Sequence, residues 1–241
     1  MTDPSGLRPV PDSPAGFPGA SDLPTDVVTW GPDIGDESTL RMLGTPAGRK
    51  FLVLGLGRGH AAVALAAAGA KVIAIDPDLA AIDAARRLAD AEEVKVEIHH
   101  GDLAEIPFLR ADTIDAALSI HELGRIDDLD RVLRQVNRVL RTGGTFTASL
   151  PHPAWGMVEH NAFGPPRLIR TYGDSTAQEI DGVTLHLRSI GEVVASFQRA
   201  NFRIDHVLEP MGRPEHPDSY WSEVMALVPA TLIVRGRKEG V

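Results

Sequence analysis

The chain of 241 residues contains no cysteine, which excludes disulfide bonds, thiolate zinc sites and cysteine nucleophiles. It also lacks any apolar run near the roughly 20 residues that a membrane-spanning helix needs. Its first residues lack the basic start and apolar stretch of a secretory signal. We therefore expect no membrane span and a cytoplasmic location.

Positive charge is scarce, with 24 Lys and Arg against 33 Asp and Glu, giving a net charge of −9. Nucleic-acid-binding surfaces are normally basic, so the balance favours a small-molecule substrate over RNA or DNA, although a local basic patch is compatible with it. The nine histidines show no H-E-x-x-H or similar spacing, so we predict no metal site. The sequence does not indicate an oligomeric state.

The length suits one α/β domain, which we place at residues 26–241. Residues 1–25 hold six prolines among Gly, Ser and Asp, a composition that predicts a disordered tail because few apolar groups offset its ordering entropy. A short helix is expected at Glu37–Leu43, before the regular part of the chain begins.

From Lys50 onward, short apolar runs alternate with helical patterns. Continuous apolar runs of this length predict strands that are buried on both faces. Regular alternation of strand and helix predicts a doubly wound α/β fold, a parallel sheet with helices on both faces. The expected strands are Phe51–Leu54, Lys71–Ile75, Val94–His99, Ile114–Ile120 and Thr145–Leu150, and the expected helices are His60–Ala70, Leu79–Ala89 and Asp127–Leu140.

Residues 151–187 break this alternation. They are rich in Pro, Gly, His and aromatic residues, and we interpret them as an irregular insertion on the substrate side of the same domain. Ser189 and Glu192 have the spacing of a capping box, which predicts that a helix resumes there. Arg203–Leu208 and Ala230–Arg235 are expected to be closing strands.

Gly55, Gly57 and Gly59 lie between the first strand and the first helix of the sheet. Glycine permits positive φ and close approach of a ligand to the backbone, and the helix N-terminus behind the loop offers free N–H groups. A dinucleotide fingerprint, G-x-G-x-x-G, would place its third glycine at His60. The observed spacing, G-x-G-x-G, therefore disfavours an NAD-dependent oxidoreductase, which is retained only as a minor alternative.

Asp76 ends the second strand, 21 residues beyond Gly55. This is close to the spacing of about 20 residues at which an acidic side chain meets ribose hydroxyls in the dinucleotide-binding fold. A carboxylate can accept hydrogen bonds from both hydroxyls. The alternative is that Asp76 merely caps the helix that follows.

The chain is similar to the class I S-adenosylmethionine (SAM)-dependent methyltransferases, in particular to the small-molecule branch that includes quinone-biosynthesis enzymes. The resemblance rests on the G-x-G-x-G loop, Asp76-Pro77, Gly101-Asp102-Leu103 and the run Arg138–Gly144. It implies a Rossmann-like sheet of seven strands in the order 3-2-1-4-5-7-6, with the last strand antiparallel. We expect the glycines of Arg138–Gly144 to end a helix in the left-handed conformation.

The resemblance also implies S-adenosyl-L-methionine as the cofactor. Asp76 would hold the ribose hydroxyls, and Asp102 the adenine amino group with neighbouring backbone framing the ring. For Asp102 the alternative is an ordinary turn residue. The residues implied to bind the cofactor are Gly55, Gly57, Gly59, Asp76, Pro77, Asp102, Leu103 and Ser119.

One position departs from the family pattern. The family usually has Asp or Glu two residues before the first glycine, where it helps to hold the charged amino-acid end of SAM, and this chain has Val53. Because the other cofactor positions are present, we favour an active enzyme that methylates O, C or N of a small molecule. The alternative is a catalytically weakened binding or regulatory protein.

Two histidines are candidate general bases, because ligands of open α/β sheets bind beyond the carboxyl ends of the strands. His121 follows the fourth strand and His152 the fifth; the alternative for each is an ordinary polar surface group. Several aromatic residues, together with Arg170, would either close over the acceptor or bury the insertion onto the domain. The aromatic residues are Trp30, Trp155, Phe163, Tyr172, Tyr220 and Trp221.

Overall fold

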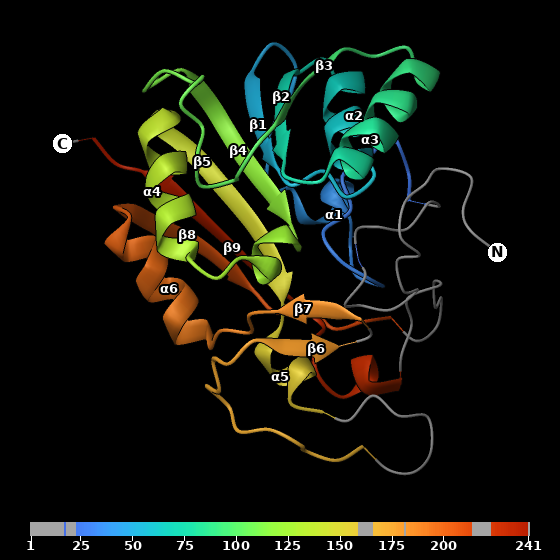
Figure 1. The fold of residues 1–241 in the computed structure, drawn as a ribbon, viewed down its shortest axis with the longest axis vertical. Helices are drawn as coiled ribbons and strands as arrows, with labels where there is room; N and C mark the ends of the chain where they lie inside the picture. The colour runs from blue at the N-terminus through green and yellow to red at the C-terminus, as the bar shows by residue number, and fades with distance from the viewer. Residues whose placement is uncertain (1–16, 18–22, 159–165, 181, 214–222, 241) are drawn as a thin grey trace.

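The computed structural model describes residues 17, 23–158, 166–180, 182–213 and 223–240 (Figure 1). Its centre is a seven-stranded sheet in the order β3-β2-β1-β4-β5-β9-β8. The five strands from β3 to β5 are parallel, and β9 is antiparallel to both of its neighbours. This confirms the predicted order and the antiparallel last strand. The bounds are β1 Lys50–Leu54, β2 Lys71–Asp76, β3 Val96–His100, β4 Ile114–Ile120, β5 Leu140–Pro151, β8 Phe202–Leu208 and β9 Thr231–Lys238.

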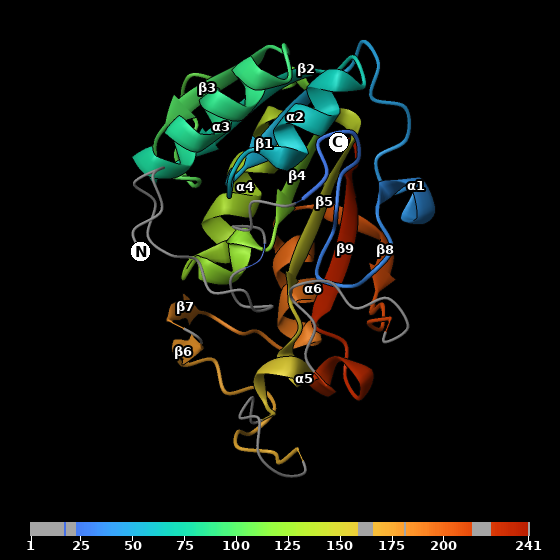
Figure 2. The ribbon, with the colours of Figure 1, turned by 90° about the vertical axis from the view of Figure 1, so that its right-hand side faces the viewer.

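Helices cover both faces of the sheet (Figures 1 and 2). Along β1, Leu52 and Leu54 belong to the apolar cluster of one face, and Phe51 and Val53 to that of the other. Successive side chains of a strand point to opposite faces, so a continuous apolar run fills both layers. The first cluster takes in α4 (Leu129–Val139) and α6 (Ile190–Arg199), and the second takes in α2 (His60–Ala67) and α3 (Leu79–Ala91).

Helices α4 and α6 begin with side-chain caps. Asp128 accepts a hydrogen bond from the backbone N–H of Arg131 at 2.9 Å. At α6, Ser189 and Glu192 form the predicted capping box in both directions. These contacts satisfy backbone donors that an uncapped helix leaves without partners, which explains why both helices start where the sequence indicates.

The expected role of the run Arg138–Gly144 as a left-handed helix stop is wrong. Helix α4 ends at Val139, its C-cap Leu140 is extended, and β5 begins at once. Gly143 has φ +79°, but it lies in a bulge of β5 where the pairing with β4 shifts between Ile114 and Ala116. Gly144 permits close approach, since a Cβ there would lie 2.8 Å from the carbonyl oxygen of Arg141 and 3.1 Å from that of Asp115.

The insertion after β5 contains regular structure that the sequence did not predict. Helix α5 (Pro153–Gly156) is followed by an antiparallel hairpin of β6 (Gln178–Ile180) and β7 (Val183–Leu185). The hairpin lies beyond the carboxyl ends of β4 and β5 (Figure 1). Its strands are only three residues long, too short for an alternating pattern to stand out. The insertion packs on a small apolar cluster that includes Trp155, Leu185 and Met225.

The segment before β1 is part of the core. Helix α1 spans Glu37–Leu40, shorter than expected, because Arg41 adopts the left-handed conformation. Trp30 is fully buried, and its indole N–H donates to Glu37 Oε2 at 3.0 Å. The residues 1–16 and 18–22 of the predicted tail lie outside the described residues, whereas Phe17 is buried against the apolar cluster of α2 and α3.

Gly236 in β9 gives a test of the packing between the closing strands and α6. A Cβ at this position would lie 2.9 Å from Phe197 Cδ1 and 2.9 Å from Phe202 Cβ. We predict that Gly236→Ala lowers the free energy of unfolding by about 1–3 kcal/mol, measured by urea denaturation. Gly191→Ala is the control, because its Cβ would meet open space early in α6, and an equal loss in both variants would contradict this prediction.

Candidate functional site

The glycine loop between β1 and α2 has the conformation that the sequence predicted. Gly55, Gly57 and Gly59 all have positive φ, at +80°, +54° and +98°. A Cβ on Gly59 would lie 2.7 Å from Ala85 Cα in α3, so this glycine lets the loop lie against that helix. At Gly55 a Cβ would overlap with Cβ and Cγ of Glu122. Glycine is therefore required here for both backbone conformation and close approach.

Asp76 ends β2 beside this loop and is buried. Its Oδ2 accepts the Leu56 N–H at 2.6 Å, and its Oδ1 accepts the Asp78 N–H at 2.7 Å. Burial raises the pKa of the Asp76 carboxyl, while these two hydrogen bonds oppose the rise. The cap of α3 is Asp78, which accepts from the N–H of Ala80. Asp76 is thus tied to the glycine loop and is not the cap of the next helix.

The remaining residues predicted to bind the cofactor differ in what their side chains can contact. Ser119 is buried, and its hydroxyl donates to the carbonyl of Leu54 at 2.8 Å, joining β4 to β1. Leu103 has its side chain in the core, which leaves only its backbone for a ligand. Asp102 and Pro77 are exposed, and Asp102 Oδ1 also accepts the N–H of Ala104.

Residues 23–30, here called the N-terminal cover, lie over the glycine loop. Leu23 and Thr29 line a cavity together with Gly55, Leu56 and His60, and its free volume is about 10 Å³. This is room for about one water molecule, whereas pockets for drug-sized ligands measure about 300 Å³ or more. This cavity is therefore too small for a nucleotide-sized cofactor unless the cover shifts.

His121 directly follows β4, has a left-handed backbone (φ +57°) and is buried. Its Nε2 lies 3.0 Å from Thr231 Oγ1, and the Phe17 ring meets the imidazole edge-on at 5.2 Å between centroids. Its Nδ1 has no hydrogen-bond partner among the described residues. Burial lowers the pKa of His121 to about 3, and the nearby Arg125 charge adds to this. The imidazole is neutral in this arrangement.

His152 is the N-cap of α5, and both of its ring nitrogens are engaged. Its Nδ1 accepts the N–H of Ala154 at 3.0 Å, so Nε2 carries the proton and donates to Glu209 Oε1 at 2.9 Å. Burial lowers the pKa of His152, and the hydrogen bond to Glu209 works against that shift. Both predicted bases lie near the start of β9. His121 contacts Thr231, and the backbone N–H of His152 donates to the carbonyl of Ala230.

Glu122 is the residue on the cofactor side to which the sequence analysis gave no role. It begins a 3₁₀ helix, η1 (Glu122–Arg125), directly after His121, and its side chain folds back onto Gly55. The carboxyl group is largely buried, and burial raises its pKa while the charge of Arg125 opposes the rise. The sequence holds no local signal for this contact, because Glu122 and Gly55 are joined only by the pairing of β4 with β1.

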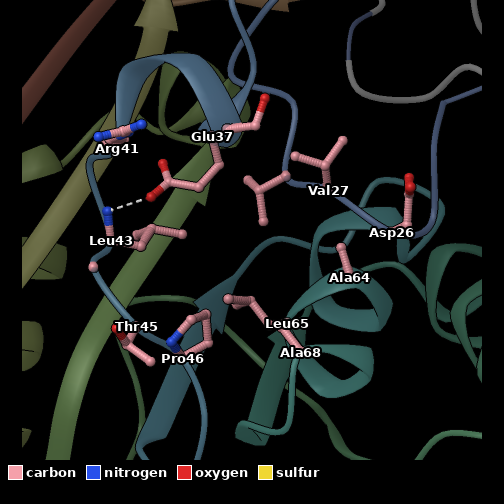
Figure 3. Close-up of a pocket in the computed structure, with 13 residues that line it drawn as sticks. Asp26, Val27, Glu37, Arg41, Leu43, Thr45, Pro46, Ala64, Leu65 and Ala68 are labelled. Atoms are coloured by element: carbon pink, nitrogen blue, oxygen red, sulfur yellow. Dashed lines mark hydrogen bonds between the residues drawn. The ribbon is translucent and has the colours of Figure 1, made fainter.

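A larger hollow of about 450 Å³ lies between the segment before β1 and the second half of α2 (Figure 3). Glu37 faces it, but its carboxylate already accepts the N–H groups of Leu43 and Met42 and the Trp30 indole. The hollow lies toward the amino ends of the strands, whereas ligands of open α/β sheets bind at their carboxyl ends. We therefore do not assign it to the cofactor.

Those of the predicted aromatic residues that the structure describes do not gather in one place. Trp30 and Trp155 are buried in two different apolar clusters, and Tyr172 is half exposed, with its hydroxyl accepting the N–H of Ile190. Phe163, Tyr220 and Trp221 lie outside the described residues. Within the part of the chain that the structure describes, no helix is long and apolar enough to cross a membrane, and no group of His, Asp or Glu could hold a metal ion.

Comparison with known proteins agrees with this geometry. Residues 51–144 match a family model described as a methyltransferase domain. The chain resembles, at 26% identity, a SAM-dependent methyltransferase from Mesorhizobium loti of known structure; the TM-score is 0.68, with 82% of this chain and 94% of the other covered. The family model, the relatives and the fold together support a class I SAM-dependent methyltransferase domain. The matched segment holds the glycine loop, Asp76 and Asp102, and its implied cofactor is SAM.

Two curated relatives match over less than half of this chain. A probable SAM-dependent methyltransferase of Mycolicibacterium smegmatis is 34% identical over 106 residues, covering 44% of this chain and 39% of the relative. The demethylmenaquinone methyltransferase of Clavibacter sepedonicus is 33% identical over 107 residues, covering 44% and 43%. The chain thus spans about two fifths of the length of these relatives.

The burial of His121 predicts a pH-dependent stability. Its folded pKa lies below the usual 6.5, so on acidification the unfolded state binds a proton that the folded state excludes. From pH 7 to pH 5 this histidine alone should lower the free energy of unfolding by about 2 kcal/mol.

We predict that His121→Gln removes this part of the pH dependence, as measured by urea denaturation at the two pH values. The exposed His100 serves as the control, and His100→Gln should retain the wild-type dependence. A His121→Gln variant with an unchanged pH dependence would show that the imidazole is not buried as described.

Proposed function

We propose that this protein transfers the methyl group of SAM to an oxygen, carbon or nitrogen atom of a small molecule. The observation that carries the proposal is the attachment of Asp76 to the Leu56 N–H of the glycine loop, at the carboxyl edge of the sheet. This bond holds a carboxylate beside three positive-φ glycines, an arrangement suited to a ribose next to a closely packed backbone.

The residues present fit this cofactor. Glycine is required at position 55 by close contact, and the buried Asp76 carboxylate retains lone pairs for ribose hydroxyls. Asp102 and the backbone of Leu103 and Pro77 are proposed for the adenine side, and Ser119 fixes the loop by joining β4 to β1. When bound, SAM supplies a methyl group already activated by the positive charge on sulfur. The protein then has to position the acceptor and exclude water.

Of the two candidate bases, the geometry favours His121. It is neutral, and its Nδ1 has no hydrogen-bond partner among the described residues, so it keeps a lone pair or an N–H for an acceptor. His152 uses one nitrogen to cap α5 and the other to bind Glu209. We propose that His121 takes the proton of the acceptor and that His152 positions the start of the insertion.

Displacement of Phe17 would matter for this role, as a shift of the N-terminal cover would for cofactor entry. A base works best with a pKa near the working pH, and the pKa of about 3 belongs to the fully buried imidazole packed against Phe17. Displacement of Phe17 would hydrate His121 and raise its pKa toward the usual range. The acceptor would then occupy the space next to the imidazole.

A small-molecule acceptor is supported by the net charge of −9, which disfavours a nucleic acid, and by the insertion over the carboxyl ends of β4 and β5. Demethylmenaquinone methyltransferase, named for a quinone, is among the relatives. We propose a cytoplasmic location, because no apolar run in the sequence is long enough for a membrane-spanning helix.

A second candidate function is SAM binding without turnover, which is favoured by Val53, since this apolar residue is buried in the core.

The first test is cofactor binding measured by isothermal titration calorimetry. We expect the wild-type protein to bind SAM and S-adenosylhomocysteine (SAH) in the micromolar range. Asp76→Ala should weaken both by about tenfold or more, because a hydrogen bond to a charged group contributes about 1.5–3 kcal/mol. Asp90→Ala, an exposed position on α3, should bind like wild type. Absence of binding to the folded wild-type protein would refute the proposal.

The second test separates an enzyme from a binding protein. Wild-type protein incubated with SAM and a panel of phenols, quinols, carboxylic acids, amines and a structured RNA should release SAH with at least one small molecule. His121→Gln should lower that turnover by about 100-fold with unchanged SAH affinity, whereas His152→Gln should keep most of it. Release of SAH with the RNA alone would refute the small-molecule acceptor.

A further inference from the structure

Glu122 reaches the glycine loop from the neighbouring strand. The left-handed backbone of His121 turns the chain at the end of β4, and η1 begins at Glu122. A Cβ on Gly55 would overlap with Cβ and Cγ of Glu122 and would lie 3.2 Å from its Cδ. The carboxyl group therefore lies against the first glycine of the loop, at the carboxyl end of β1.

The Glu122 carboxylate lacks the partners that a buried charge normally has. Its side chain is 13% exposed, and among the residues that the structure describes it accepts no hydrogen bond. Its cationic neighbour is Arg125, whose Nε lies 3.8 Å from Oε2 and whose own side chain is 36% exposed. A buried carboxylate in this state is costly unless a cation or several donors reach it.

The surrounding charge is negative. Asp76 and Asp78 both act on Glu122 to disfavour its ionised form, against the single charge of Arg125. The buried carboxylate of Asp76 and the largely buried one of Glu122 thus lie at one edge of the sheet with one partly exposed guanidinium near them. An additional positive group at this point would relieve the repulsion and provide hydrogen-bond donors.

The apolar side chain of Val53 explains why a positive group of a ligand at this point would depend on Glu122 for a carboxylate. Position 53 carries an acidic residue in the family pattern, but here its side chain is apolar, fully buried and paired in the sheet with Ala74 and Leu118. Strand β1 therefore offers no carboxylate to the loop. Gly55, two residues further on, is the point at which Glu122 arrives from β4 instead.

We infer that Glu122 binds the α-ammonium group at the methionyl end of the cofactor and so replaces the carboxylate that Val53 lacks. The ammonium group has three N–H donors and a positive charge, which match an ionised carboxylate without hydrogen bonds. The inference rests on the proposed function, because it names a binding residue for the same cofactor. The acidic residue then comes from η1, which directly follows β4, and not from β1.

The test compares two ligands that differ at the methionyl end. SAH carries the ammonium group, whereas 5′-methylthioadenosine keeps the adenosine and the sulfur and lacks the amino-acid portion. By calorimetry on the full chain, Glu122→Gln should weaken SAH by about tenfold or more and leave 5′-methylthioadenosine within about twofold. Asp76→Ala should weaken both ligands, and Glu97→Gln, an exposed carboxylate on β3, should weaken neither.

The outcomes distinguish the two proposals. Wild-type protein that binds neither ligand would refute the proposed function. Wild-type protein that binds both ligands, with SAH affinity unchanged in Glu122→Gln or with both ligands weakened equally, would overturn the role of Glu122 and leave the cofactor assignment intact. A thermal melt of each variant shows whether it is folded before its affinity is read.

A measurement on the wild-type protein keeps the inference testable if Glu122→Gln does not fold. The charged groups that act on Glu122 are Arg125 on η1, Asp76 at the end of β2 and Asp78 at the start of α3. Because burial raises the pKa of Glu122, acidification toward that pKa should protonate it and lower the affinity for SAH relative to that for 5′-methylthioadenosine. Asp76 affects both ligands alike through the shared adenosine, so a ratio that stays constant would overturn the inference.

Discussion

The hydrogen bond from the Leu56 N–H to Asp76 ties the glycine loop to the end of β2, and the geometry of the cofactor side depends on it. Ser119 makes the corresponding link on the other side, from β4 to the last carbonyl of β1. The loop is thus held between its two neighbouring strands before any ligand binds. A preformed loop of this kind lowers the ordering cost that binding would otherwise carry.

The same edge of the sheet concentrates groups that are unfavourable in the absence of a ligand. Asp76 and Glu122 are buried carboxyl groups with raised pKa, and His121 is a buried imidazole with a strongly lowered pKa. Buried titratable groups with displaced pKa values are typical of functional sites. Here all three lie within two residues of the carboxyl end of β2 or β4, and Phe17 covers His121.

The sequence was sufficient for the parts of the fold that repeat a simple pattern. Continuous apolar runs predicted β1, β2 and β4 within one residue, and the capping box at Ser189 located α6. It failed where tertiary contacts outweigh local preference. Gly143 and Gly144 suggested a helix stop, but pairing with β4 draws them into a strand. The hairpin β6–β7 is too short to be recognised, and it is positioned by packing on Trp155 and Met225.

The candidate site shows the same division between features that a local pattern predicts and features that depend on tertiary contacts. The positive φ of the three glycines could be predicted, because their spacing determines the turn. The contact of Glu122 with Gly55 could not, since it depends on the register of two strands 65 residues apart, the separation at which Ser119 meets Leu54. The engagement of both His152 nitrogens is equally non-local, because Glu209 arrives from beyond β8.

The matched segment 51–144 ends at the fifth residue of β5, and this boundary has a consequence for what can fold alone. A fragment cut there would lose the pairing partner of β4 and the stacked rings of Phe146, Phe197 and Phe202. It would also lose Trp30 from the opposite layer, and β4 would become an open edge prone to aggregation. The matched segment is therefore not an autonomous cooperative unit, because sequence outside it supplies strand pairing and packing that stabilise it.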